Sequence, residues 1–122
     1  MTINQAITAL DTGKANTHSR QDKLGWLSRV DGMIQSQLHD THAGGPTQFS
    51  GYTDSTDPDQ ELLVPAPWDE LYLHYMQAQI DYLNGDMTRY ANGAALYNTC
   101  LVAYKNHYNR THAPKGQNWR YF

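Results

Sequence analysis

The chain has 122 residues, a formal net charge of −3 and a hydrophobic fraction of 39%, which includes nine tyrosines. This size suits one domain over residues 1–122, and the lack of any run of 18 apolar residues excludes a membrane span. The single cysteine, Cys100, excludes an internal disulfide. Because the first residues lack the basic start and apolar core of a signal peptide, we expect synthesis and retention in a cytoplasm.

A thin, tyrosine-rich core leaves two alternatives open. Part of the apolar surface is completed by a partner, or the chain is a marginal but self-sufficient helical domain.

The first predicted helix covers residues 2–11, where Thr2 and Gln5 form a capping-box pattern and Gly13 follows as a stop. A second helix is predicted over 19–40, with Ser19 or Asn16 as its cap. Its apolar residues recur at intervals of three and four: Leu24, Leu27, Val30, Ile34 and Leu38. Gly25 and Gly32 each weaken this helix by about 1 kcal/mol relative to alanine and suggest close packing.

Residues 43–66 form a predicted long irregular loop, rich in Gly, Pro, Asp, Ser and Thr. Two short strands, over 47–52 and 61–64, are conceivable within it and would make a small hairpin. Loops of this length in compact domains are usually functional or disordered.

Two long antiparallel helices are predicted to follow the loop. Residues 65–70 form a strong helix start, Asn84-Gly85 ends that helix, and Asp86 caps the next one. The last helix, over 87–108, carries a heptad seam with steps of four and three: Tyr90, Ala94, Tyr97, Leu101, Tyr104 and Tyr108. Its tyrosines pack inside the subunit or serve as interface residues, where tyrosine is enriched; we carry Tyr90, Tyr97, Tyr104 and Tyr108 forward as interface candidates.

An extended tail is predicted over residues 109–122. It is basic and ends in aromatic residues, so we expect it to dock on its own domain or on a neighbour. The candidate anchors and their basic companions are Arg110, Lys115, Trp119, Arg120, Tyr121 and Phe122.

Charge is segregated along the chain. Residues 30–88 contain no lysine or arginine, and every charged residue there is an acid, including the loop residues Asp54, Asp57, Asp59 and Glu61. From residue 89 onward the charged residues are all bases. Solvated faces explain such clustering, and so does a self-complementary surface suited to head-to-tail contact between identical subunits.

No motif predicts catalysis, a cofactor or a metal. His39 and His42 lie three apart but lack further ligands in sequence, and Cys100 lies mid-helix among apolar residues. Residues 54–59 lack the glycine and final glutamate of a calcium-binding loop. We therefore expect neither an enzyme nor a metal protein.

Several stretches resemble one family. The segments ELLVPAPWDELY (61–72), QIDYLNGD (79–86) with Tyr90, and YNRTHAP (108–114) are similar to stretches in small proteins of tailed-bacteriophage head-to-tail modules. The resemblance covers about residues 3–122, and its motifs are architectural rather than catalytic. The long loop departs from a minimal helical bundle.

The resemblance implies an all-α fold of about four helices and a structural role as a head-to-tail connector, also called an adaptor or head-completion protein. It would be made in the bacterial host cytoplasm and reside in the virion neck as a homo-oligomeric ring below the portal. Its partners would be itself, the portal and a stopper or tail-completion protein, with genomic DNA passing without sequence-specific contact and no membrane. The acidic loop would line the channel or touch a neighbour.

The alternative function is a small cytoplasmic DNA-binding or regulatory protein that uses the basic, aromatic C-terminal region for phosphate contact and base stacking. The acidic net charge weighs against this alternative, because long-range attraction to DNA would be weak.

Overall fold

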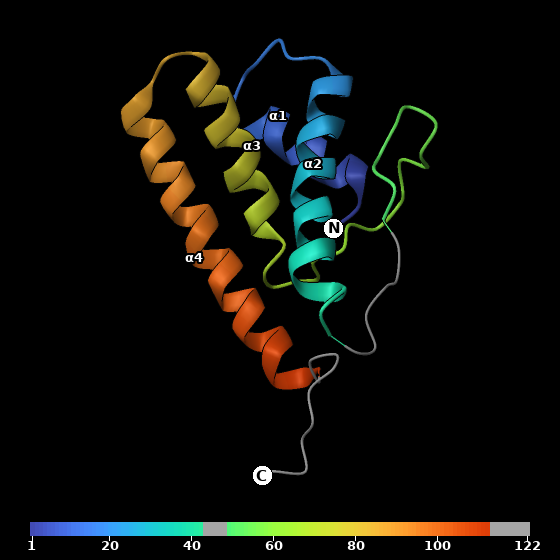
Figure 1. The fold of residues 1–122 in the computed structure, drawn as a ribbon. Coiled ribbons are helices and arrows are strands. Elements are labelled where there is room, and N and C mark those ends of the chain that lie inside the picture. The colour runs from blue at the N-terminus through green and yellow to red at the C-terminus, as the bar shows by residue number, and fades with distance from the viewer. Residues whose placement is uncertain (43–48, 113–122) are drawn as a thin grey trace, which may run out of the picture.

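The computed structural model describes residues 1–42 and 49–112 and is all-α, as predicted (Figure 1). Its α-helices are α1 (Ile3–Gly13), α2 (Arg20–Ile34), α3 (Glu70–Leu83) and α4 (Met87–Thr111). A π-helical turn, η1 (Gln35–His39), extends α2. The helices α2 and α3 lie between α4 on one flank and the loop that begins at residue 49 on the other (Figure 1).

The helix starts follow the predicted caps. The Thr2 side chain accepts a hydrogen bond from the Gln5 N–H, and the Gln5 side chain accepts one from the Thr2 N–H, which completes a capping box. Ser19, rather than Asn16, caps α2 through the Asp22 N–H. The loop also supports the start of α1, because the carbonyls of Gln60 and Pro58 accept from the N–H groups of Ile3 and Asn4.

The helix predicted over residues 19–40 does not stay α-helical to its end. From Gln35 to His39 the turn widens, and the Asp40 N–H donates to the Gln35 carbonyl five residues back. Leu38 and His39 are buried in this turn. The widened turn brings His39 against α4, where its Nε2 lies 3.0 Å from the Tyr104 hydroxyl.

The two C-terminal helices form the predicted antiparallel hairpin. Gly85 has a positive φ of 76° at the turn, and the Asp86 side chain caps α4 by accepting from the Arg89 N–H. The helices approach closely at Gly93, where a Cβ would lie 3.2 Å from the Ala78 Cβ.

Two predictions about irregular segments are corrected. No strand is present in the described residues 49–52 and 61–64; Glu61 instead makes an isolated antiparallel bridge with Thr2. Residues 109–111, predicted as the start of an extended tail, are helical: α4 continues through Thr111, and the Thr111 hydroxyl donates to the His107 carbonyl. The rest of the predicted tail lies outside the described residues.

Candidate interaction surfaces

The tyrosine seam of α4 faces the interior of the subunit. Tyr97, Tyr104 and Tyr108 are more than nine-tenths buried in the hydrophobic core. Three aromatic pairs join α4 to α3 and the residues before it: Tyr82 with Tyr90, Tyr75 with Tyr97, and Trp68 with Tyr104, at centroid distances of 5.3, 5.2 and 5.8 Å. Each step of seven residues on one side meets a step of seven on the other, as heptad pairing requires.

These three aromatic pairs decide between the two alternatives for the tyrosine seam. Tyr97, Tyr104 and Tyr108 are core residues of the subunit, so they are not free to serve as interface anchors. The physical reason is that other residues of the same chain cover them: Tyr75 and Trp68 lie against Tyr97 and Tyr104, and His39 and His42 lie against Tyr108. Tyr90 is partly exposed and pairs with Tyr82, whose side chain is 54% exposed, near the turn between the helices.

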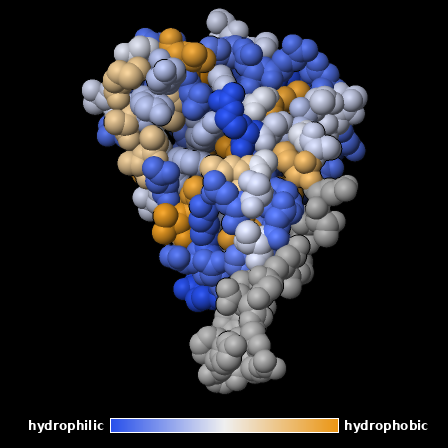
Figure 2. All heavy atoms as spheres, in the orientation of Figure 1, coloured by the Kyte–Doolittle hydropathy of each residue, from blue (hydrophilic) through white to orange (hydrophobic). Residues whose placement is uncertain are grey.

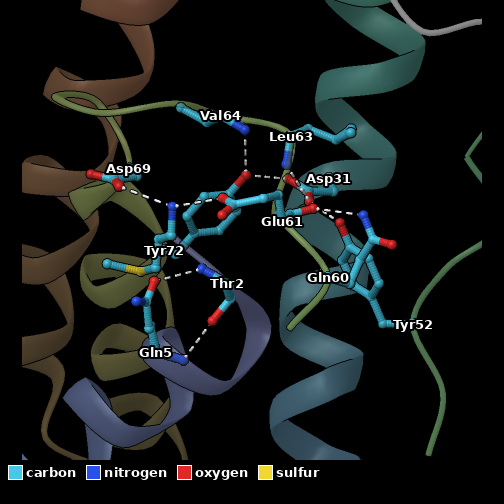
Figure 3. Close-up of polar contacts among 11 residues, drawn as sticks. Thr2, Gln5, Asp31, Tyr52, Gln60, Glu61, Leu63, Val64, Asp69 and Tyr72 are labelled. Carbon is cyan, nitrogen blue, oxygen red and sulfur yellow. Dashed lines mark hydrogen bonds and ion pairs between the residues drawn. The ribbon is translucent and has the colours of Figure 1, made fainter. Parts of the chain in front are cut away.

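A buried carboxylate that the sequence did not single out organises the loop. Asp31 on α2 is fully buried and accepts hydrogen bonds from the Tyr52 hydroxyl, from the Tyr72 hydroxyl at 2.5 Å and from the Leu63 N–H at 3.1 Å (Figure 3). The Tyr72 hydroxyl in turn accepts from the Val64 N–H at 2.8 Å. We call these four residues around Asp31 (Tyr52, Leu63, Val64 and Tyr72), together with Asp31 itself, the Asp31 clasp.

The electrostatics of the clasp follow from its burial. Desolvation raises the pKa of Asp31, although the three hydrogen bonds it accepts oppose that rise. Burial and the neighbouring Asp31 carboxyl also raise the pKa of Tyr52 and of Tyr72. Asp31 and Tyr72 are closed to solvent, Tyr52 is partly exposed, and the hydrogen-bonding groups of the clasp are used internally, so it holds the loop rather than forming a ligand site.

The clasp fixes both ends of an acidic loop segment. Tyr52 and Leu63 bond to the same Asp31 oxygen, and the Ser28 hydroxyl accepts from the Tyr52 N–H at 2.8 Å. Between these ends the predicted acidic residues all project into solvent: Asp54, Asp57, Asp59 and Glu61. Glu61 also pairs with the N-terminal amine at 3.2 Å. The acidic side chains therefore stand on a fixed segment at one flank of the molecule.

The opposite flank is the outer face of α4, which carries no charge over residues 90–104. The exposed side chains there are small or uncharged polar, apart from the larger apolar Leu96 and Val102, which are 53% and 55% exposed. Pale and tan residues gather on the upper part of this flank, and orange and blue ones lie below them (Figure 2). Bases border it at both ends: Arg89, which pairs with Asp86 at 3.4 Å, precedes it, and Lys105 and Arg110 follow it. We call this surface the outer face of α4.

Four of the six histidines gather near the C-terminal end of α4, but not as a metal centre. Tyr108 lies between His39, His42 and His112, at centroid distances of 4.8, 5.2 and 3.8 Å, and His107 stacks on Trp68 at 4.2 Å. Burial lowers the pKa of His39. Within residues 1–42 and 49–112, no three His, Cys, Asp or Glu side chains meet as a metal site requires.

Two further sets of candidate residues are Cys100 and the residues of the predicted tail. Cys100 is a free, partly buried thiol whose pKa is raised by burial, which does not favour a nucleophile. Among the tail candidates, Arg110 is exposed on the last turn of α4. Lys115, Trp119, Arg120, Tyr121 and Phe122 lie outside the described residues.

Comparison with known proteins identifies no relative of this chain. No protein-family model matches the chain, and no curated protein or solved structure matches it. None of the helices in the described ranges combines the length and apolar character needed to cross a bilayer.

Proposed function

We propose that this chain is a subunit of a head-to-tail connector of a tailed bacteriophage. In this role a ring of copies lies below the portal in the virion neck, extends the DNA channel and offers a platform for the stopper or tail. The proposal starts from the resemblance of residues 61–72, 79–86 and 108–114 to stretches in proteins of such modules.

The observation that carries the proposal is the opposition of two unlike surfaces on one small body. The acidic loop segment held by the Asp31 clasp is on one flank, and the uncharged outer face of α4, bordered by bases, is on the other (Figure 1). A heterologous contact joins two different surfaces, one from each of two neighbouring copies, so it can repeat from copy to copy. The copies form a ring when the rotation between neighbours closes on itself. Opposite charges at the two surfaces favour the correct register.

The direct test is electron microscopy of the chain mixed with purified portal or with tailless heads. We expect added density with the rotational symmetry of a ring at the outer end of the portal. A chain that ends at residue 112 tests the tail candidates: it should keep its circular dichroism spectrum, because the described helices are intact, and bind the portal more weakly.

A DNA mobility-shift titration of the isolated chain at two salt concentrations separates the connector from the DNA-binding alternative. The connector role predicts no shift at micromolar protein. A salt-sensitive shift together with no portal density would reject the connector and support DNA binding through the basic C-terminal region.

A further inference from the structure

We propose that a groove beside Gly25 on α2 receives the outer face of α4 from a second copy of this chain. This inference rests on the proposed function, since it names the two surfaces that meet in the ring. Its own observations are a glycine and a helix face that no residue of 1–42 or 49–112 covers, and a groove above that glycine.

Gly25 and Gly32 lie seven residues apart on one ridge of α2, but only one of them is covered. At Gly32 a Cβ would lie 3.8 Å from the Phe49 ring, so the loop side chain occupies the space that glycine leaves. At Gly25 a Cβ would meet nothing within 4 Å. Glycine in the middle of a helix is destabilising relative to alanine, and no contact within the described subunit explains its presence at residue 25.

The groove above Gly25 has a volume of about 250 Å³ and lies between α2 and the loop. Its lining residues are Gln21, Leu24, Gly25, Tyr52, Thr53 and Asp54. Its walls are held in place, because Gln21 donates to Asp54 at 2.9 Å and Tyr52 is fixed by Ser28 and Asp31. The floor is uncharged, and Asp54 supplies a carboxylate at the rim.

The outer face of α4 fits this groove in chemistry. Leu96 and Val102 are exposed apolar side chains of a size that could lie over Gly25 as Phe49 lies over Gly32. Small residues next to them, Ala95 and Thr99, allow a second helix to approach closely.

The charges that border the two surfaces are complementary. Arg89, Lys105 and Arg110 flank the outer face of α4, and Asp54 lies at the groove with Asp57 and Asp59 further along the loop. Arg29, a base on the same ridge as Gly25, is directed to α3, where it lies 3.5 Å from the Tyr75 hydroxyl. Because the groove and the α4 face are on opposite flanks, each copy offers both surfaces, and the contact repeats from copy to copy.

Photo-cross-linking of the full chain without portal tests the contact. A photoreactive amino acid replaces Val102, and unlabelled and ¹⁵N-labelled chains are mixed up to about 1 mM, where even a millimolar dissociation constant populates the contact. We expect mixed-isotope cross-links to residues 21–25 or 52–54. The absence of intermolecular cross-links, or cross-links confined to other surfaces, would overturn the proposal.

Two substitutions sharpen the test. Gly25→Ala should raise the folding equilibrium constant about fivefold, which corresponds to roughly 1 kcal/mol of helix propensity, while reducing intermolecular cross-linking. Leu96→Asp should reduce cross-linking about tenfold or more, because it places a carboxylate in the contact next to Asp54. Leu83→Asp, at an equally exposed apolar residue in the last turn of α3, is the matched control and should leave cross-linking unchanged.

Failure of this contact and failure of the connector assignment are distinguishable. Cross-links at the groove without portal binding would keep the contact and reject the connector. A ring on the portal with no cross-links at the groove would keep the connector and reject the contact.

Discussion

At the scale of single residues, Tyr72 and Tyr97 show how differently two buried tyrosines can be used. The Tyr72 hydroxyl donates to Asp31 and accepts from the Val64 N–H. The Tyr97 hydroxyl is buried without a hydrogen-bond partner in the described structure. The ring of Tyr97 pairs with Tyr75, so Tyr97 contributes packing alone. Tyr72 contributes packing and also connects α3 to α2 and to the loop.

This difference predicts opposite results for one chemical change. Tyr72→Phe should lower the free energy of unfolding by about 2–4 kcal/mol, because a buried carboxylate oxygen and a buried N–H lose their partner. Tyr97→Phe should change it by less than about 1 kcal/mol or raise it, since the hydroxyl it removes has no partner to lose. Urea titration at pH 7 measures both. Equal losses for the two variants would contradict the assigned role of the clasp.

Asp31 could not have been identified from the sequence as the centre of this arrangement. Its spacing from Leu27 and Ile34 places it next to the apolar stripe of α2, which was a usable signal that it is buried. Its partners, however, are 21, 32 and 41 residues away in sequence, and no local pattern predicts them. The helix caps Thr2, Ser19 and Asp86 were predictable because each acts within three residues of itself.

At the scale of elements, the pairing of α3 with α4 was predictable and the end of α2 was not. Both seams repeat every seven residues, and the short turn at Asn84-Gly85 requires the helices to run antiparallel, so the register follows. The same dipeptide at Asn92-Gly93 has another use: it lies within α4, where Gly93 lets α3 approach. The π-helical turn at Gln35–His39 depends on packing against α4, which sequence periodicity does not report.

The close approach at Gly93 predicts a packing defect for larger residues. Gly93→Val should lower the free energy of unfolding by about 1–3 kcal/mol, because its side chain would enter space occupied by Ala78. The exchange Ala78→Gly with Gly93→Ala is the control: it moves one methyl group across the contact and should lie close to the wild type. Thermal unfolding followed by circular dichroism measures all three. A fully stable Gly93→Val would show that the helices are not pressed together there.

At the scale of the whole molecule, the buried tyrosines make stability depend on alkaline pH. Burial raises the pKa of Tyr97 and of Tyr104 from 10.0 to about 12. Above pH 10 the unfolded chain loses phenol protons that the folded chain retains. The stability that these groups contribute is therefore fully present below pH 10 and is lost as the pH rises towards 12.

The expected slope is about 1.4 kcal/mol per pH unit for each such phenol between pH 10 and 12. Urea midpoints at pH 8, 10 and 11 measure it. Tyr97→Phe should reduce the slope, whereas Leu83→Ala, at an exposed side chain without a titratable group, is the control and should not. A slope unaffected by Tyr97→Phe would mean that this phenol ionises in the folded chain.

The all-α class was accessible to sequence reasoning because helical periodicity is local. The position of the loop against α2 was not, since it depends on Phe49 over Gly32 and on the Asp31 clasp. The two candidate surfaces also differ in whether the sequence could identify them. The acidic loop residues were identified from charge alone, but the uncharged outer face of α4 emerged only once the tyrosines were seen to point inward.

The clasp has a consequence for how this protein can diversify. The segment between Tyr52 and Leu63 leaves and returns at one carboxylate oxygen, so insertions or deletions between Tyr52 and Pro58, ahead of the residues that bond to α1, meet the helices at unchanged points. Doubling the length of such a segment costs only about 0.6 kcal/mol of closure entropy. The shape of the subunit on this flank can therefore change through short insertions or deletions, while the helices keep their arrangement.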